Sequence, residues 1–148
     1  MKIYLDISVI SALFDERNPE RKSLTEEFIS KIGIYTTYIS ELTIAEIDKT
    51  PDPLLRSKMK EAIKNFTILE VTESTEELAK EYVKYGAIPE SYFEDAYHIA
   101  VTVLNEMDYL LSWNLRHIVR RKTKDIVRMV NSLKNLKQVE IITPGELL

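Results

Sequence analysis

The stretch KIYLDISVISALF, residues 2–14, changes its hydrophobic rhythm at Asp6. Residues 2–6 form a short apolar run, which is typical of a β-strand. Apolar residues then recur at helical spacing over residues 7–14, which predicts a helix directly after the strand. The order strand, acid, helix places Asp6 at the end of the first strand.

The rest of the chain repeats this alternation of strand and helix. Strands are expected where β-branched and aromatic residues cluster, at residues 34–39, 67–71, 109–112 and 139–142. Helices are expected at residues 18–33, 41–47, 54–66, 74–86, 91–106 and 116–136. The alternation predicts an α/β fold, a three-layer α/β/α sandwich around a mainly parallel sheet of four to five strands.

Local signals set the expected helix ends. Gly33 is expected to stop the helix that begins at Asn18. Two Ser-x-x-Glu capping boxes are expected to open later helices. They pair Ser74 with Glu77 and Ser91 with Glu94.

Composition narrows the class of protein. The 148 residues have the length of one domain, and 45% hydrophobic with 30% charged residues is a globular profile. With no Cys there are no disulfides, thiolate nucleophiles or cysteine metal sites, which fits a cytoplasmic protein. Three isolated glycines cannot form a Walker loop or a dinucleotide fingerprint. No apolar run approaches the ~20 residues that span a membrane, and the start MKIYLD does not resemble a signal peptide.

Polar residues follow the predicted strands at one edge of the sheet. Asp6 ends the first strand, Glu46 lies in the helix after the second, and Asn114 follows YLLSW. Asp95 lies near the start of an apolar, buried helix. Because ligands of open α/β sheets bind beyond the carboxyl ends of the strands, we expect these four side chains to converge.

Each of the four residues also has a structural alternative. Asp6 can simply cap the next helix, and Glu46 can complete a capping box with Thr43. Asp95 can belong to a buried ion pair, and Asn114 can be a turn residue.

Clustered carboxylates favour a cation. Carboxylates that lie together repel and raise one another's pKa, and a divalent ion removes that cost. Oxygen ligands without Cys and with only two His predict Mg²⁺ or Mn²⁺. Such an ion activates water for the hydrolysis of a phosphodiester.

Five segments in this order resemble PIN-domain nucleases of the kind found as toxins in VapBC-type toxin–antitoxin pairs. They are YLDISVI (4–10), ELTIAEI (41–47), EDAYHIAVT (94–102), YLLSWNLRHIV (109–119) and EIITPGELL (140–148). Together they span nearly the whole chain, and the fourth resembles a branch of the family with an SWN motif.

The resemblance implies roles for individual residues. Asp6, Glu46 and Asp95 would be the metal ligands, with Ser8 as a supporting hydroxyl. Asn114 departs from the family pattern, which often has an acid at this position, so a second metal is in doubt.

Further contacts to substrate are expected around Asn114. Ser112 and Asn114 would orient water or phosphate. His117, one helical turn past Asn114, can contact phosphate or, as base rates favour, be a surface histidine. His98 is expected to be a core histidine with its hydrogen bonds satisfied.

The net charge of -4 does not suggest a nucleic-acid protein, but its distribution does. Residues 116–137 carry eight Lys and Arg against Asp125 alone, and Arg116 and Arg120 begin this segment beside Asn114. A run of this kind is either a solvated helix face or a phosphate-binding surface.

The sequence thus predicts a Mg²⁺- or Mn²⁺-dependent endoribonuclease, with RNA as substrate. The resemblance implies an antitoxin partner and a homodimer. The alternative is a catalytically weak or inactive PIN-like module that binds RNA or protein. A phosphatase of the haloacid-dehalogenase type is disfavoured, because Ser8 stands where that chemistry needs a second Asp.

Overall fold

The computed structural model describes all of residues 1–148. Its strands are β1 (Lys2–Leu5), β2 (Thr36–Ser40), β3 (Thr67–Leu69), β4 (Tyr109–Leu111) and β5 (Glu140–Ile142). Its α-helices are α1 (Ile7–Ala12), α2 (Pro19–Ser30), α3 (Glu41–Asp48), α4 (Pro53–Ile63), α5 (Glu73–Lys84), α6 (Phe93–Leu104) and α7 (Arg121–Leu133). Short 3₁₀ helices lie at Ile32–Ile34, Glu90–Tyr92 and Pro144–Leu147.

The five strands form one sheet in the order β3-β2-β1-β4-β5, and every neighbouring pair is parallel. In register, Ile3 of the central strand lies opposite Thr37 of β2 and Tyr109 of β4. The predicted α/β sandwich is therefore confirmed, and the sheet is wholly parallel.

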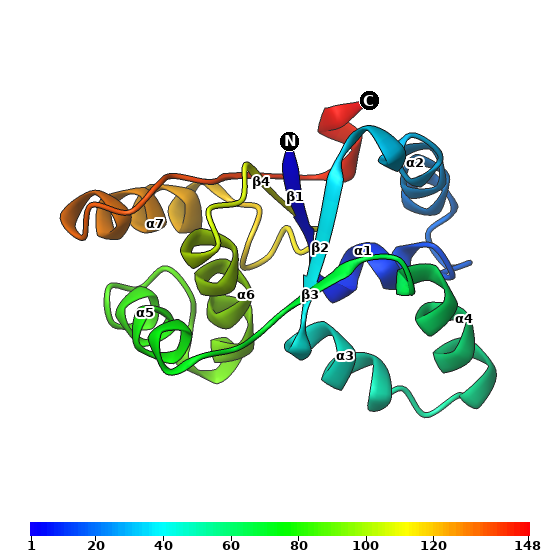
Figure 1. Cartoon of the computed structure of the whole chain (residues 1–148), viewed down its shortest axis with the longest axis horizontal. Helices are drawn as coiled ribbons and strands as arrows, with labels where there is room; N and C mark the ends of the chain where they lie inside the picture. The colour runs from blue at the N-terminus through cyan, green and yellow to red at the C-terminus, as the bar shows by residue number, and fades with distance from the viewer.

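Helices cover both faces of this sheet. Figure 1 shows α5, α6 and α7 on one side of β1 and β2, and α1, α2, α3 and α4 on the other. Alternation along β1 serves both layers: Tyr4 packs into the core under α5, α6 and α7, whereas Ile3 and Leu5 pack into the opposite core. Because β1 is buried on both faces, residues 3–5 form a continuous apolar run.

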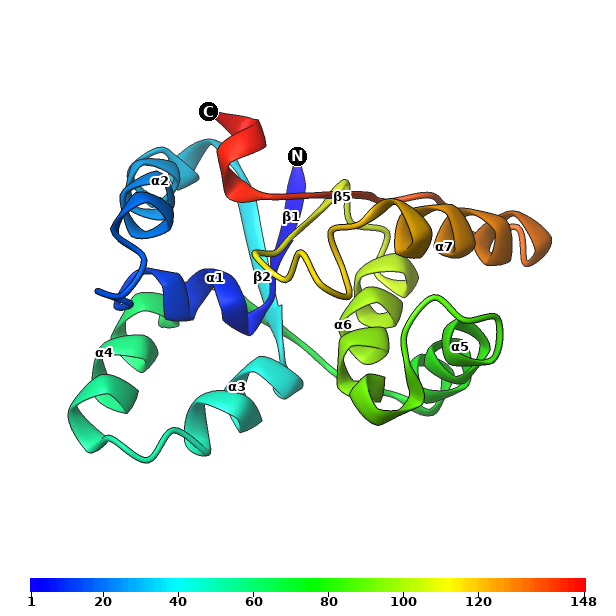
Figure 2. The same cartoon turned by 180° about the vertical axis from the view of Figure 1, so that it is seen from behind.

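The chain path creates a switch point at β1. From β1 the chain moves outward through β2 to β3, then returns to place β4 on the other side of β1, followed by β5. The two directions diverge between β1 and β4. Figure 2, seen from behind, shows β2 beside β1 and β5 on the side of α7. In open α/β sheets, the carboxyl ends of the strands at such a point form the ligand-binding crevice.

The two predicted capping boxes are wrong. Helix α5 begins at Glu73, and Thr72 caps it in a reciprocal box with Thr75. Helix α6 begins at Phe93 without any side-chain cap. Both segments have the Ser-x-x-Glu spacing. However, the strand before α5 and the loop before α6 end at other residues than these serines, so each helix begins elsewhere.

Two predicted helix boundaries also move. Helix α2 ends at Ser30, and Gly33 lies in the following 3₁₀ helix. The basic segment is helical only from Arg121, because Asn114 accepts a hydrogen bond from the His117 backbone and holds residues 114–117 in a turn.

No helix of the chain is both long and apolar enough to cross a membrane.

Candidate functional site

Asp6 lies at the carboxyl end of β1, and three groups hold its carboxylate. It caps α1 by accepting a hydrogen bond from the Ser8 backbone N–H at 3.0 Å. The Ser8 hydroxyl also donates to Oδ1, and the Ser112 hydroxyl donates to Oδ2 at 2.6 Å. The capping alternative is therefore correct, yet it leaves the carboxylate at the switch point between β1 and β4.

Glu46 reaches the same region from the second turn of α3. The capping-box alternative is excluded, because Ser40 caps this helix and the Thr43 hydroxyl is buried without a partner. Instead, Glu46 Oε1 forms a hydrogen bond with His98 Nε2 at 2.7 Å.

His98 connects Glu46 to a chain of buried hydroxyls. Its Nδ1 lies 2.6 Å from the Tyr4 hydroxyl, which lies 2.7 Å from the Ser40 hydroxyl. Ser40 in turn accepts from the Leu42 backbone N–H at 3.2 Å. His98 is a satisfied core histidine as predicted, and it also ties Glu46 to the start of α3.

Asp95 lies in the first turn of α6 beside Asn114 and His117. Asn114 Nδ2 donates to Asp95 Oδ2 at 3.2 Å, and His117 Nδ1 lies 3.3 Å from the same oxygen. The prediction that His117 is more often a surface residue is wrong, because its side chain is buried and its ring packs on Tyr92 at 4.1 Å. The turn at Asn114 brings this histidine back onto Asp95.

Burial dominates the electrostatics of both aspartates. It raises the pKa of Asp6, against the opposing effects of His98, Ser112 and Ser8. It also raises the pKa of Asp95, which His98, His117 and Asn114 partly offset. Glu46 adds a like charge to each of these carboxylates, so the three acids belong to one electrostatic cluster.

His98 is the basic group inside this cluster. Burial acts to lower its pKa, but Tyr4, the hydrogen bond with Glu46 and the charges of Glu46 and Asp6 together raise the pKa well above its ordinary value. The sequence argument that repelling carboxylates need an external cation is thus only partly right. Part of the compensation comes from a histidine of the chain.

The side chains as placed do not form a closed metal site, since no group of three or more Asp, Glu or His side chains lies close enough to hold an ion. The donor chemistry nevertheless suits Mg²⁺ or Mn²⁺, because the cluster offers hard carboxylate oxygens. Asp95 Oδ1 and Glu46 Oε2 accept no hydrogen bond, so both are free to coordinate. The residues therefore fit the ion by chemistry, and the carboxylates must turn toward one another to bind it.

The residues predicted to contact substrate fall into two groups. Ser8 and Ser112 are engaged with Asp6, and Ser112 is fully buried. Arg120 is likewise engaged, donating to the Ala87 carbonyl at 2.9 Å and to Thr123. Arg116 is exposed and has no ion pair, so it alone of the two arginines is free to meet a phosphate.

The Tyr4 and Ser40 links were not found from the sequence. Tyr4 reads as one more apolar residue of β1, and its hydroxyl becomes significant only when α6 packs over that strand. Strand alternation does place Tyr4 on the opposite face from Ile3, which was the available signal.

Comparison with known structures defines the fold class. The chain has the PIN-like fold of VapC toxins. VapC20 of Mycobacterium tuberculosis, a toxin that cleaves the Sarcin-Ricin loop, superposes with a TM-score of 0.60 at 17% identity, over 75% of this chain and 88% of that chain. VapBC2 of Rickettsia felis, bound to a DNA fragment of its promoter, gives 0.59 at 12% identity, over 95% and 97%. No protein-family model and no curated protein matches the chain.

Proposed function

We propose that this protein is an endoribonuclease that hydrolyses RNA phosphodiester bonds with the help of Mg²⁺ or Mn²⁺. The observation that carries the proposal is the convergence of Asp6, Glu46 and Asp95 in one electrostatic cluster at the switch point of the sheet. The PIN-like fold and the Sarcin-Ricin loop cleavage of VapC20 support RNA as the substrate class.

In this proposal Asp6, Glu46 and Asp95 hold the metal. The bound ion supplies an acidic water and neutralises charge on the phosphate. Ser8 and Ser112 orient Asp6 through their hydrogen bonds, and His98 orients Glu46.

Asn114 and His117 contact Oδ2 of Asp95, which leaves Oδ1 for the metal, and both would face the phosphate. Asn114 holds Asp95 in place, and its neutral amide adds no charge to the metal cluster. Arg116, exposed beside them, supplies a cation for the RNA backbone.

The direct test is cleavage of a structured RNA by the purified protein. We expect cleavage in Mn²⁺ or Mg²⁺ and none in EDTA. Cleavage that persists in EDTA would contradict the proposed chemistry.

The second candidate is a PIN-like module that binds RNA or protein without turnover. Two observations favour this function. Asn114 stands where the family that the sequence resembles often has an acid, and Glu46 is already paired with His98. Titration calorimetry with Mn²⁺ separates the two functions. The nuclease predicts saturable binding that Asp6→Asn weakens, whereas the inert module predicts no measurable heat.

We also propose that the protein is the toxin of a type II toxin–antitoxin pair, in the SWN-motif branch suggested by residues 112–114. A cognate antitoxin, a homodimer and a cytoplasmic location complete this proposal. The likeness to VapBC2 supports it. Co-expression with the antitoxin should restore the growth of cells that the chain arrests.

A further inference from the structure

A cleft of about 840 Å³ lies on the face of α6 that is turned away from the carboxylates. Phe93 and Tyr97, one helical turn apart, line it, whereas Asp95 projects from the other side of the helix. The end of α5 and the start of α7 form the walls. The cleft is therefore separate from the acid cluster, although both share α6.

Cations stand on both walls of this cleft. Lys80 and Lys84 lie one turn apart on α5, and Arg120 and Lys122 lie opposite them. Glu90 is the only acid in the lining. Lys80 is paired with Glu76, but Lys84 and Lys122 are exposed and have no ion pair, so their charges are available to a ligand.

The floor between the walls is aromatic and apolar. Phe93 is 48% exposed and meets Tyr97 edge-on at a ring separation of 5.7 Å. Ile88 and Pro89 continue this floor. An exposed aromatic ring between two rows of cations offers a stacking surface for a base and counter-charges for its phosphates.

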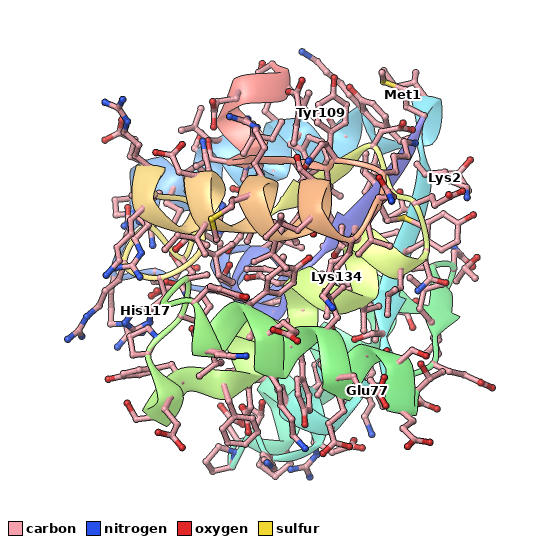
Figure 3. The ribbon with its side chains drawn as sticks, turned by 90° about the vertical axis from the view of Figure 1, so that its left-hand side faces the viewer. Met1, Lys2, Glu77, Tyr109, His117 and Lys134 are labelled. Atoms are coloured by element: carbon pink, nitrogen blue, oxygen red, sulfur yellow. The ribbon has the colours of Figure 1, made fainter.

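Two aromatic rings, those of Tyr92 and His117, lie between the cleft and the acid cluster. Tyr92, which precedes Phe93, is 43% exposed and packs on His117 at 4.1 Å. His117 lies 3.3 Å from Asp95. Figure 3 shows His117 at one end of the face on which α5 and α7 lie. The acid cluster and the cleft therefore adjoin at that end of the face.

We propose that this cleft binds a single-stranded segment of the RNA that flanks the scissile bond. A base stacks on Phe93, and the adjoining phosphates lie against Lys84 and Lys122. The inference rests on the proposed ribonuclease function and adds to it a binding subsite outside the acid cluster. Single-stranded rather than duplex RNA is indicated, because stacking on a protein ring requires an unpaired base.

The test is the affinity for a fluorescein-labelled single-stranded oligouridylate, measured by anisotropy in EDTA so that no cleavage occurs. The variant Lys84→Glu/Lys122→Glu should bind at least tenfold more weakly. The slope of log affinity against log salt should fall by about 1.4, since each phosphate contact on a single strand contributes ~0.7.

A matched control reverses the same amount of charge elsewhere. Lys49→Glu/Lys58→Glu changes two exposed lysines without ion pairs at the end of α3 and on α4. It should alter the affinity less than twofold. If the cleft variant and the control bind the oligonucleotide alike, the subsite is wrong.

Phe93→Ala tests the stacking contribution separately. It should weaken binding about fivefold or more while leaving the salt slope unchanged, because stacking releases no counterions. Unchanged affinity in this variant would overturn the stacking role. All of these results are independent of cleavage, so failure of the nuclease proposal is read from the metal-dependent cleavage assay alone.

Discussion

At the residue scale, the site is a set of buried and half-buried acids, each of which has a donor of the chain as its partner. Glu46 pairs with His98, and Asp95 with His117 and Asn114. Burial of these acids costs stability unless they are paired. Against the effect of burial, the acids help raise the pKa of His98 well above its ordinary value, so this histidine offsets part of their mutual repulsion.

Replacing Asn114 by Asp should separate stability from metal affinity. The change removes the donor to Asp95 and adds a like charge, so the melting temperature without metal should fall. Mn²⁺ should then raise the melting temperature more than in the wild type, because a fourth carboxylate strengthens binding to the folded state. Asn114→Ala, which loses the donor without adding charge, is the control, and an equal Mn²⁺ shift in both variants would count against a metal site here.

Tyr4→Phe tests the chain of hydroxyls behind Glu46. Loss of the hydroxyl leaves His98 Nδ1 without a partner and Ser40 with the Leu42 backbone N–H alone, at a cost of about 1–3 kcal/mol. The free energy of unfolding from urea titration measures this cost. The rate of RNA cleavage at saturating substrate should fall while KM stays constant, and a change confined to KM would contradict a positioning role.

The meeting of the acids was predictable from the sequence, but their partners were not. Asp6 follows a strand, and Glu46 lies in a helix that follows one, and parallel strands bring their carboxyl ends to one edge. The contacts of His98 and His117 depend on how α6 and the turn at Asn114 pack, which no local spacing encodes.

At the element scale, the alternation of strand and helix was predicted well, whereas the caps of α5 and α6 and the start of α7 were not. A Ser-x-x-Glu pattern occurs at many positions in a sequence. The end of β3 determines that Thr72, and not Ser74, is the last extended residue before α5 and therefore its cap. The basic segment begins as a turn, because Asn114 accepts a hydrogen bond from the His117 backbone N–H. This turn, rather than a helix, places His117 against Asp95.

The two candidate caps of α5 give a direct comparison. Thr72→Ala should destabilise the protein by about 1 kcal/mol, because it removes the acceptor for the Thr75 backbone N–H. Ser74→Ala should cost less than about 0.5 kcal/mol, as for other surface changes. Chemical denaturation of both variants measures the difference, and the reverse order would refute the observed cap.

Helix α5 is joined to α7 by Tyr82, whose hydroxyl donates to Asn131. Burial raises the pKa of Tyr82, and the bond to Asn131 only partly opposes this. An unfolded tyrosine ionises near pH ~10 while the folded one stays neutral. The folded state then binds more protons, so stability falls as pH rises above that value.

Tyr82→Phe should remove part of this alkaline loss. Melting temperatures between pH 8 and 11 measure it, with Tyr85→Phe as the control at an exposed position. At pH 8 the variant should be less stable by about 1 kcal/mol, the value of one hydrogen bond. Parallel curves for Tyr82→Phe and the wild type above pH 10 would contradict the assignment.

At the scale of the whole molecule, charge and topology are arranged around one edge of the sheet. The acids collect at the carboxyl ends of the paired strands β1 and β4, at the switch point, and the cations of the cleft lie beyond α6. The overall charge of -4 is therefore the sum of an acidic centre and a basic surface beside it. This division matches a protein that binds a metal at one place and a polyanion beside it.

The most direct measurement is the single-turnover rate of RNA cleavage in Mn²⁺ for Asp95→Asn beside Glu94→Gln, which changes an exposed neighbour that lies outside the acid cluster. Loss of a metal ligand should cost at least about 100-fold, since even outer partners of metal ligands are worth 10–100-fold. We expect Asp95→Asn to be inactive to this degree and Glu94→Gln to cleave at the wild-type rate. Equal rates for Asp95→Asn and the wild type would contradict the claim that the clustered carboxylates carry the reaction.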